Sequence, residues 1–527
     1  MTDNNQYWLN HLPESMPAEI DTSGYNSIWD MASESIENHA TSPAYHHLGT
    51  NITYHQLELL SRQFAAYLQN RCNVHKGDRI ALMLPNTLAH PVAMFGILRT
   101  GAIVVNINPL FTARELQTQL MDAECRIIVA LDICTHTLSD IIEQTCIEHV
   151  ISSRLGDIHP PARRWTINMF ARYFKGMKPS PKLDSIPLKA CIHAHNLEMS
   201  EVDIKQKDLA YLQYTGGTSG TPKAVMLSHG NMVANTLQAS ACISPAFGFN
   251  TPYVITALPL YHIFAITANC FVVFRLGGCS HLITNPRDMD HFIGELKKVR
   301  PHIITGVNTL FSAMLKHPDF TKVDFSRLKL TLAGGMSMQQ STADSWHKTT
   351  GQPIVEAYGQ TEASPAITTN PVDSETFSGN IGLPLPSTEI SIRDDEGNPV
   401  GVNEPGELWA RGPQIMQGYW KNPRETAEVM TADGWLKTGD IVVMDKHGRL
   451  KIVDRKKDLI IVSGFNVYPS EIEQVLDSHP EIIEAGVVGV TQHDGPDIIK
   501  AVIVRKQQQL TAEAVIDYCR ENLTAYK

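Results

Sequence analysis

Residues 214–223 (YTGGTSGTPK) form a run that is rich in glycine and in hydroxyl side chains and that ends in a lysine. Glycines let a backbone approach an anion closely and present its N–H groups. Hydroxyls and an ammonium group are donors that suit phosphate oxygens. The residues that could contact phosphate are Thr215, Gly216, Gly217, Thr218, Ser219, Gly220, Thr221 and Lys223. The run therefore predicts a phosphate-binding loop.

This loop differs from the Walker loop, in which a lysine directly follows a glycine, because Thr221 and Pro222 stand between Gly220 and Lys223. A flexible connector of glycine, serine and threonine is the structural alternative. A connector has no need of a lysine and a proline at its end, so the composition favours phosphate binding.

Three further motifs contain residue types that could act on a nucleotide. Residues 356–362 (EAYGQTE) combine an aromatic ring with carboxylates. Residues 438–440 (TGD) end in Asp440, whose carboxylate could accept hydrogen bonds from a ribose diol. Residues 454–458 (DRKKD) precede SGFNVYP at 463–469. Alone, each motif fits a strand end, an ordinary turn or a solvated charge run equally well, so only their joint occurrence carries weight.

The elements around these motifs alternate between short β-branched runs and helical patterns up to about residue 380. Residues 79–84 precede a helical stretch at 88–100, and residues 302–306 precede another at 308–316. This alternation favours parallel sheets with helices on both faces. Beyond residue 380, turns such as DEGN at 395–398 separate short strands, which indicates an antiparallel β subdomain.

The predicted fold is therefore α/β, with a large N-terminal domain at 1–453 that ends in the β subdomain at about 380–453. A charged connector at 454–458 leads to a small α+β domain at 459–527. In that domain Ser470 and Glu473 have the spacing of a capping box, which predicts a helix from Pro469 to Asp477. Residues 485–490 and 498–504 read as strands, and residues 511–523 as a helix.

Composition narrows the class of protein. The 527 residues are 43% hydrophobic and 19% charged, which argues against a mainly disordered chain. The net charge of −11 argues against a nucleic-acid-coating protein. Nine cysteines without a CxxC pair indicate neither a disulfide framework nor a zinc site, and a reducing cytoplasm is expected. The first 20 residues lack the basic and apolar regions of a secretory signal.

Apolar stretches raise the question of membrane contact. Residues 80–105 and 253–276 contain proline, histidine, asparagine and arginine, so we interpret them as buried core segments and not as spanning helices. Residues 161–178 (PARRWTINMFARYFKGMK) combine an apolar i, i+4 stripe with five basic residues and no acid. This pattern is typical of a helix on the anionic inner face of a membrane. A helix that packs its stripe on the protein is the commoner alternative.

In this order, the four motifs resemble those of the adenylate-forming superfamily of acyl-CoA synthetases, luciferases and peptide-synthetase adenylation domains. The resemblance spans about residues 54–526. Residues 106–112 (NINPLFT), 258–264 (LPLYHIF) and 306–311 (GVNTLF) are most similar to the bacterial long-chain fatty-acid–CoA ligases. The resemblance implies a two-step reaction: a fatty carboxylate and ATP give acyl-adenylate and pyrophosphate, and coenzyme A then displaces AMP.

The resemblance also implies roles by position. Besides the loop residues, the resemblance implies seven further ATP contacts: Gly335, Tyr358, Gly359, Gln360, Thr361, Asp440 and Arg455. For the acyl group and coenzyme A it implies Tyr261, His262, Phe264, Gly334, Met336 and Gly464. As catalytic residues it implies Lys223, His262, Thr361 and Glu362. Glu362 and Thr215 would bind Mg²⁺, and Lys457 would be the hinge of a mobile C-terminal domain.

The chain departs from the family pattern at two places. Ala224 follows Lys223 where many relatives have glycine. The sequence given ends at Lys527, before the segment that carries the family's adenylation lysine, so we expect this chain to adenylate weakly. An acyl-AMP ligase and a non-catalytic adenylate- or acyl-binding protein are the alternatives that the sequence leaves open.

Overall fold

The protein is described by a computed structural model that covers residues 4–174, 178–194, 196–215, 222–248, 251–462, 465–490, 498–506 and 509–524. The chain divides into two compact units. The larger unit consists of Leu12–Thr388 and Gly412–Met430. The smaller unit consists of Met1–His11, Glu389–Arg411 and Thr431–Lys527. The segment 412–430 therefore leaves the smaller unit and packs with the larger one.

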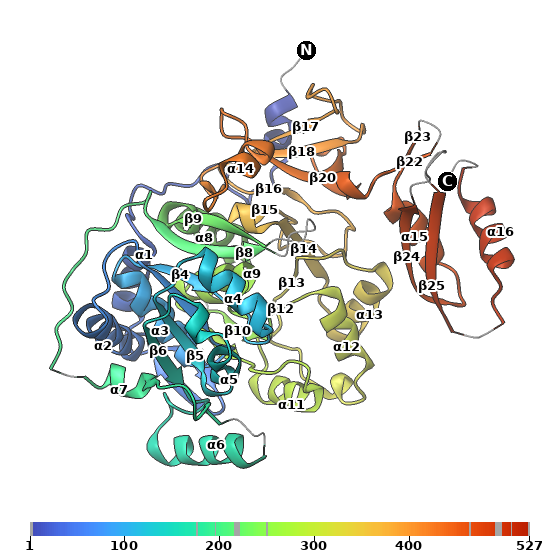
Figure 1. The fold of residues 1–527 in the computed structure, drawn as a ribbon. Coiled ribbons are helices and arrows are strands. Elements are labelled where there is room, and N and C mark those ends of the chain that lie inside the picture. Colours follow the sequence, from blue (N-terminus) through green and yellow to red (C-terminus); the bar gives the residue numbers. More distant parts are fainter. Residues whose placement is uncertain are drawn as a thin grey trace. The chain divides into compact units, whose positions relative to one another are not determined.

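The larger unit contains mixed sheets whose central strands are parallel (Figure 1). Across one sheet the order is β16 (Leu383–Pro384), β15 (Ala366–Thr369), β14 (Ile354–Gly359), β13 (Leu330–Ala333), β12 (Ile303–Gly306), β10 (Tyr253–Thr256), β11 (Cys279–Leu282), β1 (Pro43–His47) and β2 (Thr50–Thr53). Across another it is β19 (Gly418–Tyr419), β9 (Lys223–Ser228), β8 (Leu209–Thr215), β4 (Ile103–Asn106), β3 (Arg79–Met83), β5 (Ile127–Leu131), β6 (His149–Ser153) and β7 (Ile186–Pro187). Antiparallel pairing is found toward the sheet edges, at β1–β2, β14–β15, β15–β16, β8–β9 and β9–β19.

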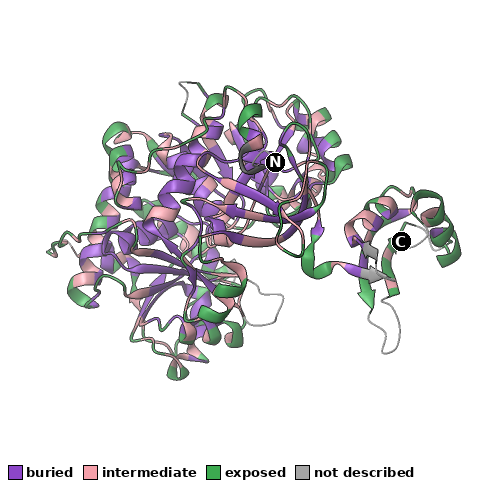
Figure 2. Cartoon of the chain, turned by 90° about the horizontal axis from the view of Figure 1, so that it is seen from above, coloured by how far each residue is buried: buried purple, intermediate pink, exposed green. Residues whose placement is uncertain are grey.

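Helices connect and cover these strands, as the alternating sequence pattern predicts. They are α1 (Ile28–His39), α2 (Tyr54–Arg71), α3 (Ala89–Arg99), α4 (Ala113–Asp122), α5 (Thr135–Ser139), α6 (Pro161–Phe174), α7 (Leu188–Ile192), α8 (His229–Ile243), α9 (Ile263–Ala265), α10 (Val273–Arg275), α11 (Met289–Val299), α12 (Asn308–Lys316), α13 (Gln340–Thr350) and α14 (Pro423–Val429). Figure 2 shows the central strands mostly buried and many helix surfaces exposed. The predicted α/β class with parallel, helix-flanked sheets is confirmed.

The two long apolar stretches form core elements. Residues 80–105 contribute to β3, α3 and β4, and residues 253–276 form β10, α9, a π-helix (Ile266–Val272) and α10. Their interpretation as buried strand and helix segments is confirmed. Within the described residues, no helix has the length and apolar character needed to span a bilayer.

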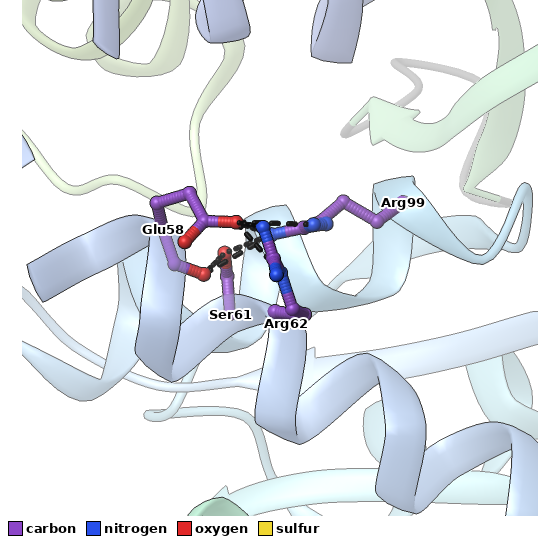
Figure 3. A network of polar contacts seen from close by, with 4 residues as sticks. All are labelled: Glu58, Ser61, Arg62 and Arg99. Atoms are coloured by element: carbon purple, nitrogen blue, oxygen red, sulfur yellow. Dashed lines mark hydrogen bonds and ion pairs between the residues drawn. The ribbon is translucent and has the colours of Figure 1, made fainter. Parts of the chain in front are cut away.

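A buried ion pair joins α2 to α3 (Figure 3). Arg99 donates to the Oε1 atom of Glu58 at 3.4 Å and to the Oγ atom of Ser61 at 3.2 Å. Arg62, one turn after Glu58, also pairs with its carboxylate. The Arg99 guanidinium lies 3.9 Å from the ring centre of Trp29. Burial lowers the pKa of Arg99 to about 10, although Glu58 favours its charged form.

The smaller unit contains an antiparallel sheet in the order β17 (Glu389–Arg393), β18 (Gly406–Arg411), β20 (Leu436–Met444) and β21 (Leu450–Arg455). Its C-terminal part consists of β22 (Ile460–Val462), β23 (Phe465–Val467), α15 (Pro469–Asp477), β24 (Ile482–Val490), β25 (Ile498–Arg505) and α16 (Ala512–Asn522). Residues such as Ile472 and Leu476 of α15 form its core with Ile482 and Val487 of β24. The predicted antiparallel region and the small α+β part are confirmed.

The predicted capping box at the start of α15 is wrong. The N-cap position is Tyr468, and no side-chain hydrogen bond caps the helix there. The carboxylate of Glu473 instead accepts a hydrogen bond from the backbone N–H of Val487 in β24, at 2.8 Å. The Glu473 side chain, which the local pattern assigned to the helix end, therefore binds a residue of another element instead.

Candidate functional site

The predicted phosphate loop connects the antiparallel strands β8 and β9. Thr215 ends β8 and Lys223 begins β9, and the two residues face each other as partners in the hairpin. The loop residues Gly216, Gly217, Thr218, Ser219, Gly220 and Thr221 lie outside the described residues. Ala224, where relatives have glycine, is buried in β9 and has no positive φ, so the strand accommodates its side chain.

The Lys223 side chain is held by two contacts with the segment 418–426 of the larger unit. Its ammonium group forms an ion pair with the carboxylate of Glu425 in α14. The same nitrogen lies 5.3 Å from the ring centre of Tyr419, a distance typical of a cation–π contact. The side chains of Lys223 and Glu425 are 22% and 30% exposed, while the paired Oε2 atom of Glu425 is itself buried.

Glu362 lies next to this pair because Tyr419 contacts both. Glu362 belongs to a short 3₁₀ turn after β14 (Thr361–Ala363). The Tyr419 hydroxyl donates to Glu362 Oε1 at 2.8 Å, and the Glu362 carbonyl accepts from the N–H of Met416 at 2.8 Å. Burial, followed by the nearby Glu362 carboxylate, raises the pKa of Tyr419. The structure thus brings a lysine, a carboxylate and the ends of the phosphate loop together, which is an arrangement suited to a metal-bound polyphosphate.

The residues before Glu362 form the end of β14 and the turn that follows. Tyr358 is buried there, and Gly359 packs so closely on the residue before β15 that an added Cβ would lie 2.0 Å from the carbonyl oxygen of Pro365. Gln360 follows, and its N–H donates to the same carbonyl at 2.9 Å. Among the described residues, the Nε2 atom of Gln360 is buried without a hydrogen-bond partner, which leaves a donor for a ligand. Thr361 directly precedes Glu362 in the turn.

The predicted acyl residues meet at the ends of β13 and β14. Gly334 directly follows β13, and an added Cβ there would lie 3.1 Å from the carbonyl oxygen of Ala357 and 3.4 Å from the ring of Phe264. Gly335 has a φ of +81°, a conformation that favours glycine. Met336 beyond it is exposed. The structure therefore groups Gly334 with Phe264 but does not bury Met336.

Tyr261 and His262 precede α9 in the same region. The carbonyl of Tyr261 accepts a hydrogen bond from Gln213 of β8 at 2.9 Å, so this segment is tied to the strand that leads into the phosphate loop. His262 caps α9, with Nδ1 accepting from the N–H of Phe264 at 3.3 Å. The imidazole is exposed to solvent, yet enough protein surrounds it to lower its pKa. Burial raises the pKa of Tyr261.

Asp440 and Arg455 lie in the smaller unit as cross-strand neighbours in β20 and β21. Their side chains pair with each other, with Arg455 Nε 3.3 Å from Asp440 Oδ1. Lys457 is exposed in the 3₁₀ turn that follows (Lys456–Asp458). Gly464 lies outside the described residues. The hinge at 454–458 and the ribose contacts stay predictions.

Tyr419 and Glu425 are site residues that sequence reasoning missed. They belong to GYWKNPRET at 418–426, which reads as an ordinary strand end and capped turn. Only the pairing of β19 with β9 reveals them, because it sets Tyr419 opposite Val225, two residues after Lys223.

Comparison with known proteins shows which family the chain matches. The AMP-binding enzyme family matches residues 32–420, and the AMP-binding enzyme C-terminal domain matches residues 471–527. The long-chain-fatty-acid–CoA ligase of Escherichia coli O157:H7 is 47% identical over 522 residues, covering 99% of this chain and 93% of that protein. The enzyme of the same name from Haemophilus influenzae is 45% identical over 524 residues, with the same coverage.

Solved structures agree with the fold. The ATP-bound MatB of Rhodopseudomonas palustris superposes with a TM-score of 0.80 at 25% identity, covering 95% of this chain and 93% of that one. The anthranilate CoA ligase AuaEII in complex with anthranoyl-AMP gives a TM-score of 0.81 at 23% identity, covering 97% and 92%. Since the family match spans most of the sequence and its relatives align over nearly the whole chain, the protein belongs to the AMP-binding enzyme family.

Proposed function

We propose that the protein ligates a long-chain fatty acid to coenzyme A at the expense of ATP, through an acyl-adenylate. The fatty carboxylate oxygen attacks the α-phosphorus of ATP, and the bond to pyrophosphate breaks. The thiol sulfur of coenzyme A then attacks the acyl carbonyl carbon, and AMP leaves with the electrons of the broken C–O bond. Neither step needs an oxidant or a reductant.

The observation that carries the proposal is the grouping of Lys223, Tyr419 and Glu362 at the β8–β9 hairpin. It occurs in a chain that is 45–47% identical to long-chain ligases over almost its full length. A fixed ammonium group offsets the negative charge that the phosphates carry, and it does so without reorganisation during the reaction. Lys223 would act in this way on the departing pyrophosphate.

The other site residues divide between the nucleotide and the acyl group. Tyr358 would pack on adenine, and Thr361 would contact the α-phosphate. Glu362 and Thr215 offer the hard oxygen atoms that Mg²⁺ prefers, so the residues present fit this ion, which would neutralise phosphate charge when bound. Phe264, beside Gly334, would line an apolar channel, where each buried CH₂ contributes about 0.8 kcal/mol and longer chains gain affinity.

The test is a steady-state assay of the full chain with Mg-ATP, coenzyme A and fatty acids of increasing length. We expect acyl-CoA and AMP as products, with a preference for long chains. Lys223→Met should lower kcat by about 10²–10³-fold. Lys298→Met, on the exposed face of α11, is the matched control and should leave the rate unchanged. Formation of ADP would refute the proposal, and so would the absence of acyl-CoA when acyl-adenylate and coenzyme A are supplied directly, since that half-reaction does not depend on the expected weak adenylation.

A second proposal concerns α6, which we infer to contact an anionic membrane surface on its cytoplasmic side. Trp165, Phe170 and Tyr173 are 64%, 52% and 69% exposed, and Ala171 is buried. The alternative that the apolar stripe packs on the protein is therefore wrong for these aromatic residues. Arginine side chains at 163, 164 and 172 accompany them, a combination suited to lipid headgroups.

Sedimentation with vesicles of phosphatidylcholine and phosphatidylglycerol tests this contact. Trp165→Glu should reduce the bound fraction several-fold. Leu110→Glu, at an apolar residue outside α6 that is 73% exposed, should leave the bound fraction unchanged. Equal binding of the wild type and the Trp165 variant would exclude α6 as the contact.

A further inference from the structure

The segment 418–426 is fixed against the phosphate-loop hairpin by its own hydrogen bonds. The backbone N–H of Trp420 donates to the carbonyl of Ala224 at 2.8 Å, which continues the β9–β19 pairing. Asn422 caps α14 by accepting from the N–H of Glu425 at 3.2 Å. Thr426 then joins the two ends of the segment, because its hydroxyl accepts from the N–H of Tyr419 at 2.9 Å and donates to the carbonyl of Asn422 at 2.8 Å. Tyr419 and Glu425 are therefore presented by a locked turn.

The group that this turn presents to Lys223 is an anion. Glu425 forms the ion pair, while the Tyr419 ring lies beside the ammonium group and its hydroxyl is committed to Glu362. Lys223 is also the residue that the proposed function assigns to the phosphates of ATP. The Lys223 ammonium group would thus pair either with the carboxylate of Glu425 or with a phosphate.

We propose that Glu425 is a resident counter-anion of Lys223, a positioning residue that aims the ammonium group before ATP arrives and that competes with the polyphosphate for it. The inference rests on the proposed function, in which Lys223 binds phosphate. The polyphosphate of Mg-ATP outcompetes a single carboxylate, because it still carries a larger negative charge than the carboxylate and because the attraction within the partly exposed pair is screened by solvent. ATP binding then transfers Lys223 from Glu425 to phosphate, and pyrophosphate release returns it.

This exchange predicts an effect opposite to that of an ordinary binding residue. Removing the charge of Glu425 abolishes the competition, so polyphosphates should bind more tightly. We expect Glu425→Gln to lower the Kd of Mg-ATP, and of inorganic tripolyphosphate, by about threefold to tenfold. The amide oxygen of glutamine can still accept a hydrogen bond from Lys223, which keeps the side chain in place.

The experiment is isothermal titration of the full chain with Mg-ATP and, separately, with tripolyphosphate. Glu428→Gln, on the same helix and paired only with Arg424 among the ion pairs of the described residues, is the matched control and should leave both Kd values unchanged. In a Lys223→Met background, Glu425→Gln should have no further effect. A thermal melt of each variant identifies loss of folding. If Glu425→Gln does not fold, Glu425→Ala, which also removes the charge, replaces it and should lower both Kd values; an unchanged or higher Kd would overturn the inference.

The outcomes separate the two claims. If the Glu425→Gln variant binds Mg-ATP as the wild type does, or more weakly, Glu425 is no competitor and the inference is overturned, while the proposed function stands. If neither protein binds Mg-ATP or tripolyphosphate, both the inference and the proposed function are overturned.

Discussion

Glu356 lies two residues before Tyr358 on β14, and it should make the fold less stable at alkaline pH. Its carboxyl group is surrounded by protein and accepts one hydrogen bond, from the N–H of Met338 at 3.3 Å. Burial raises the pKa of Glu356 from 4.5 to about 7, with this hydrogen bond opposing the change only in part. The folded protein therefore holds a proton that the unfolded chain has already released between these two pH values.

The size and sign of the effect follow from proton linkage. A pKa raised from 4.5 to about 7 corresponds to about 3 kcal/mol of folding free energy, at 1.36 kcal/mol per pH unit. Because the side chain keeps some contact with solvent, we expect a measured loss of about 1–3 kcal/mol. The loss is absent below pH 4.5, grows as the pH rises, and is complete above pH 7, where the folded carboxyl group is ionised.

Glu356→Gln removes this loss, since an amide stays neutral at every pH and can still accept from Met338. Calorimetric melting should give only a small Tm difference between variant and wild type at pH 5, where most of the loss has not yet developed. At pH 8 the variant should melt higher by on the order of 2–5 °C. Glu295→Gln is a control of opposite sign, because a hydrogen bond from His281 lowers the pKa of Glu295 to about 2 and its charge stabilises the fold at neutral pH. A Tm difference at Glu356 that does not change between pH 5 and pH 8 would refute the reasoning.

Three other predictions concern the stability of the fold. Arg99→Met should cost about 2–4 kcal/mol in denaturant unfolding, because Glu58 loses a buried partner, and adding Glu58→Gln should recover part of this. Gly359→Ala should cost about 1–3 kcal/mol and weaken ATP binding in titrations, since its Cβ would collide with a strand backbone. Acidification from pH 6.5 towards 4 should lower the Tm, because burial lowers the pKa of His46 to about 4 and the unfolded chain takes up this proton at a higher pH than the folded protein does. The His46→Gln variant should lose part of this pH dependence of the Tm. An unchanged pH profile in the variant would contradict this role of His46.

The sequence predicted the elements whose signals are local. Alternating β-branched and helical runs predicted the parallel sheets, and the glycine and hydroxyl run, predicted as a phosphate-binding loop, falls between the end of β8 and the start of β9. Local residue spacing gave a wrong prediction where a side chain could bind a residue of another element. Glu473 had the spacing of a capping residue, but the N–H of Val487 on β24 takes its carboxylate. The stripe of α6 fitted both a packed helix and a helix on a membrane surface, and only the structure shows that Trp165, Phe170 and Tyr173 are exposed.

The contacts around Lys223 lay beyond any local pattern because they come from segments far apart in the chain. Glu362 and Tyr419 are 57 positions apart, and each is ordinary in its own surroundings. Their meeting depends on β19 adding to the free edge of β9, a pairing that short, polar sequences specify weakly.

The same pairing also fixes the register of the phosphate loop. Neighbouring residues of a strand point to opposite faces, so a slip of β9 by one position would exchange the environments of Lys223 and the buried Ala224. Strand β8 holds β9 on one side through Thr215 and Lys223, and the segment 417–420 holds it on the other through backbone bonds to Met226 and Ala224. The segment that supplies Glu425 as an anion for Lys223 therefore also decides which way Lys223 points. A change that loosens β19 should for this reason affect nucleotide binding twice, by releasing the counter-anion and by releasing the register.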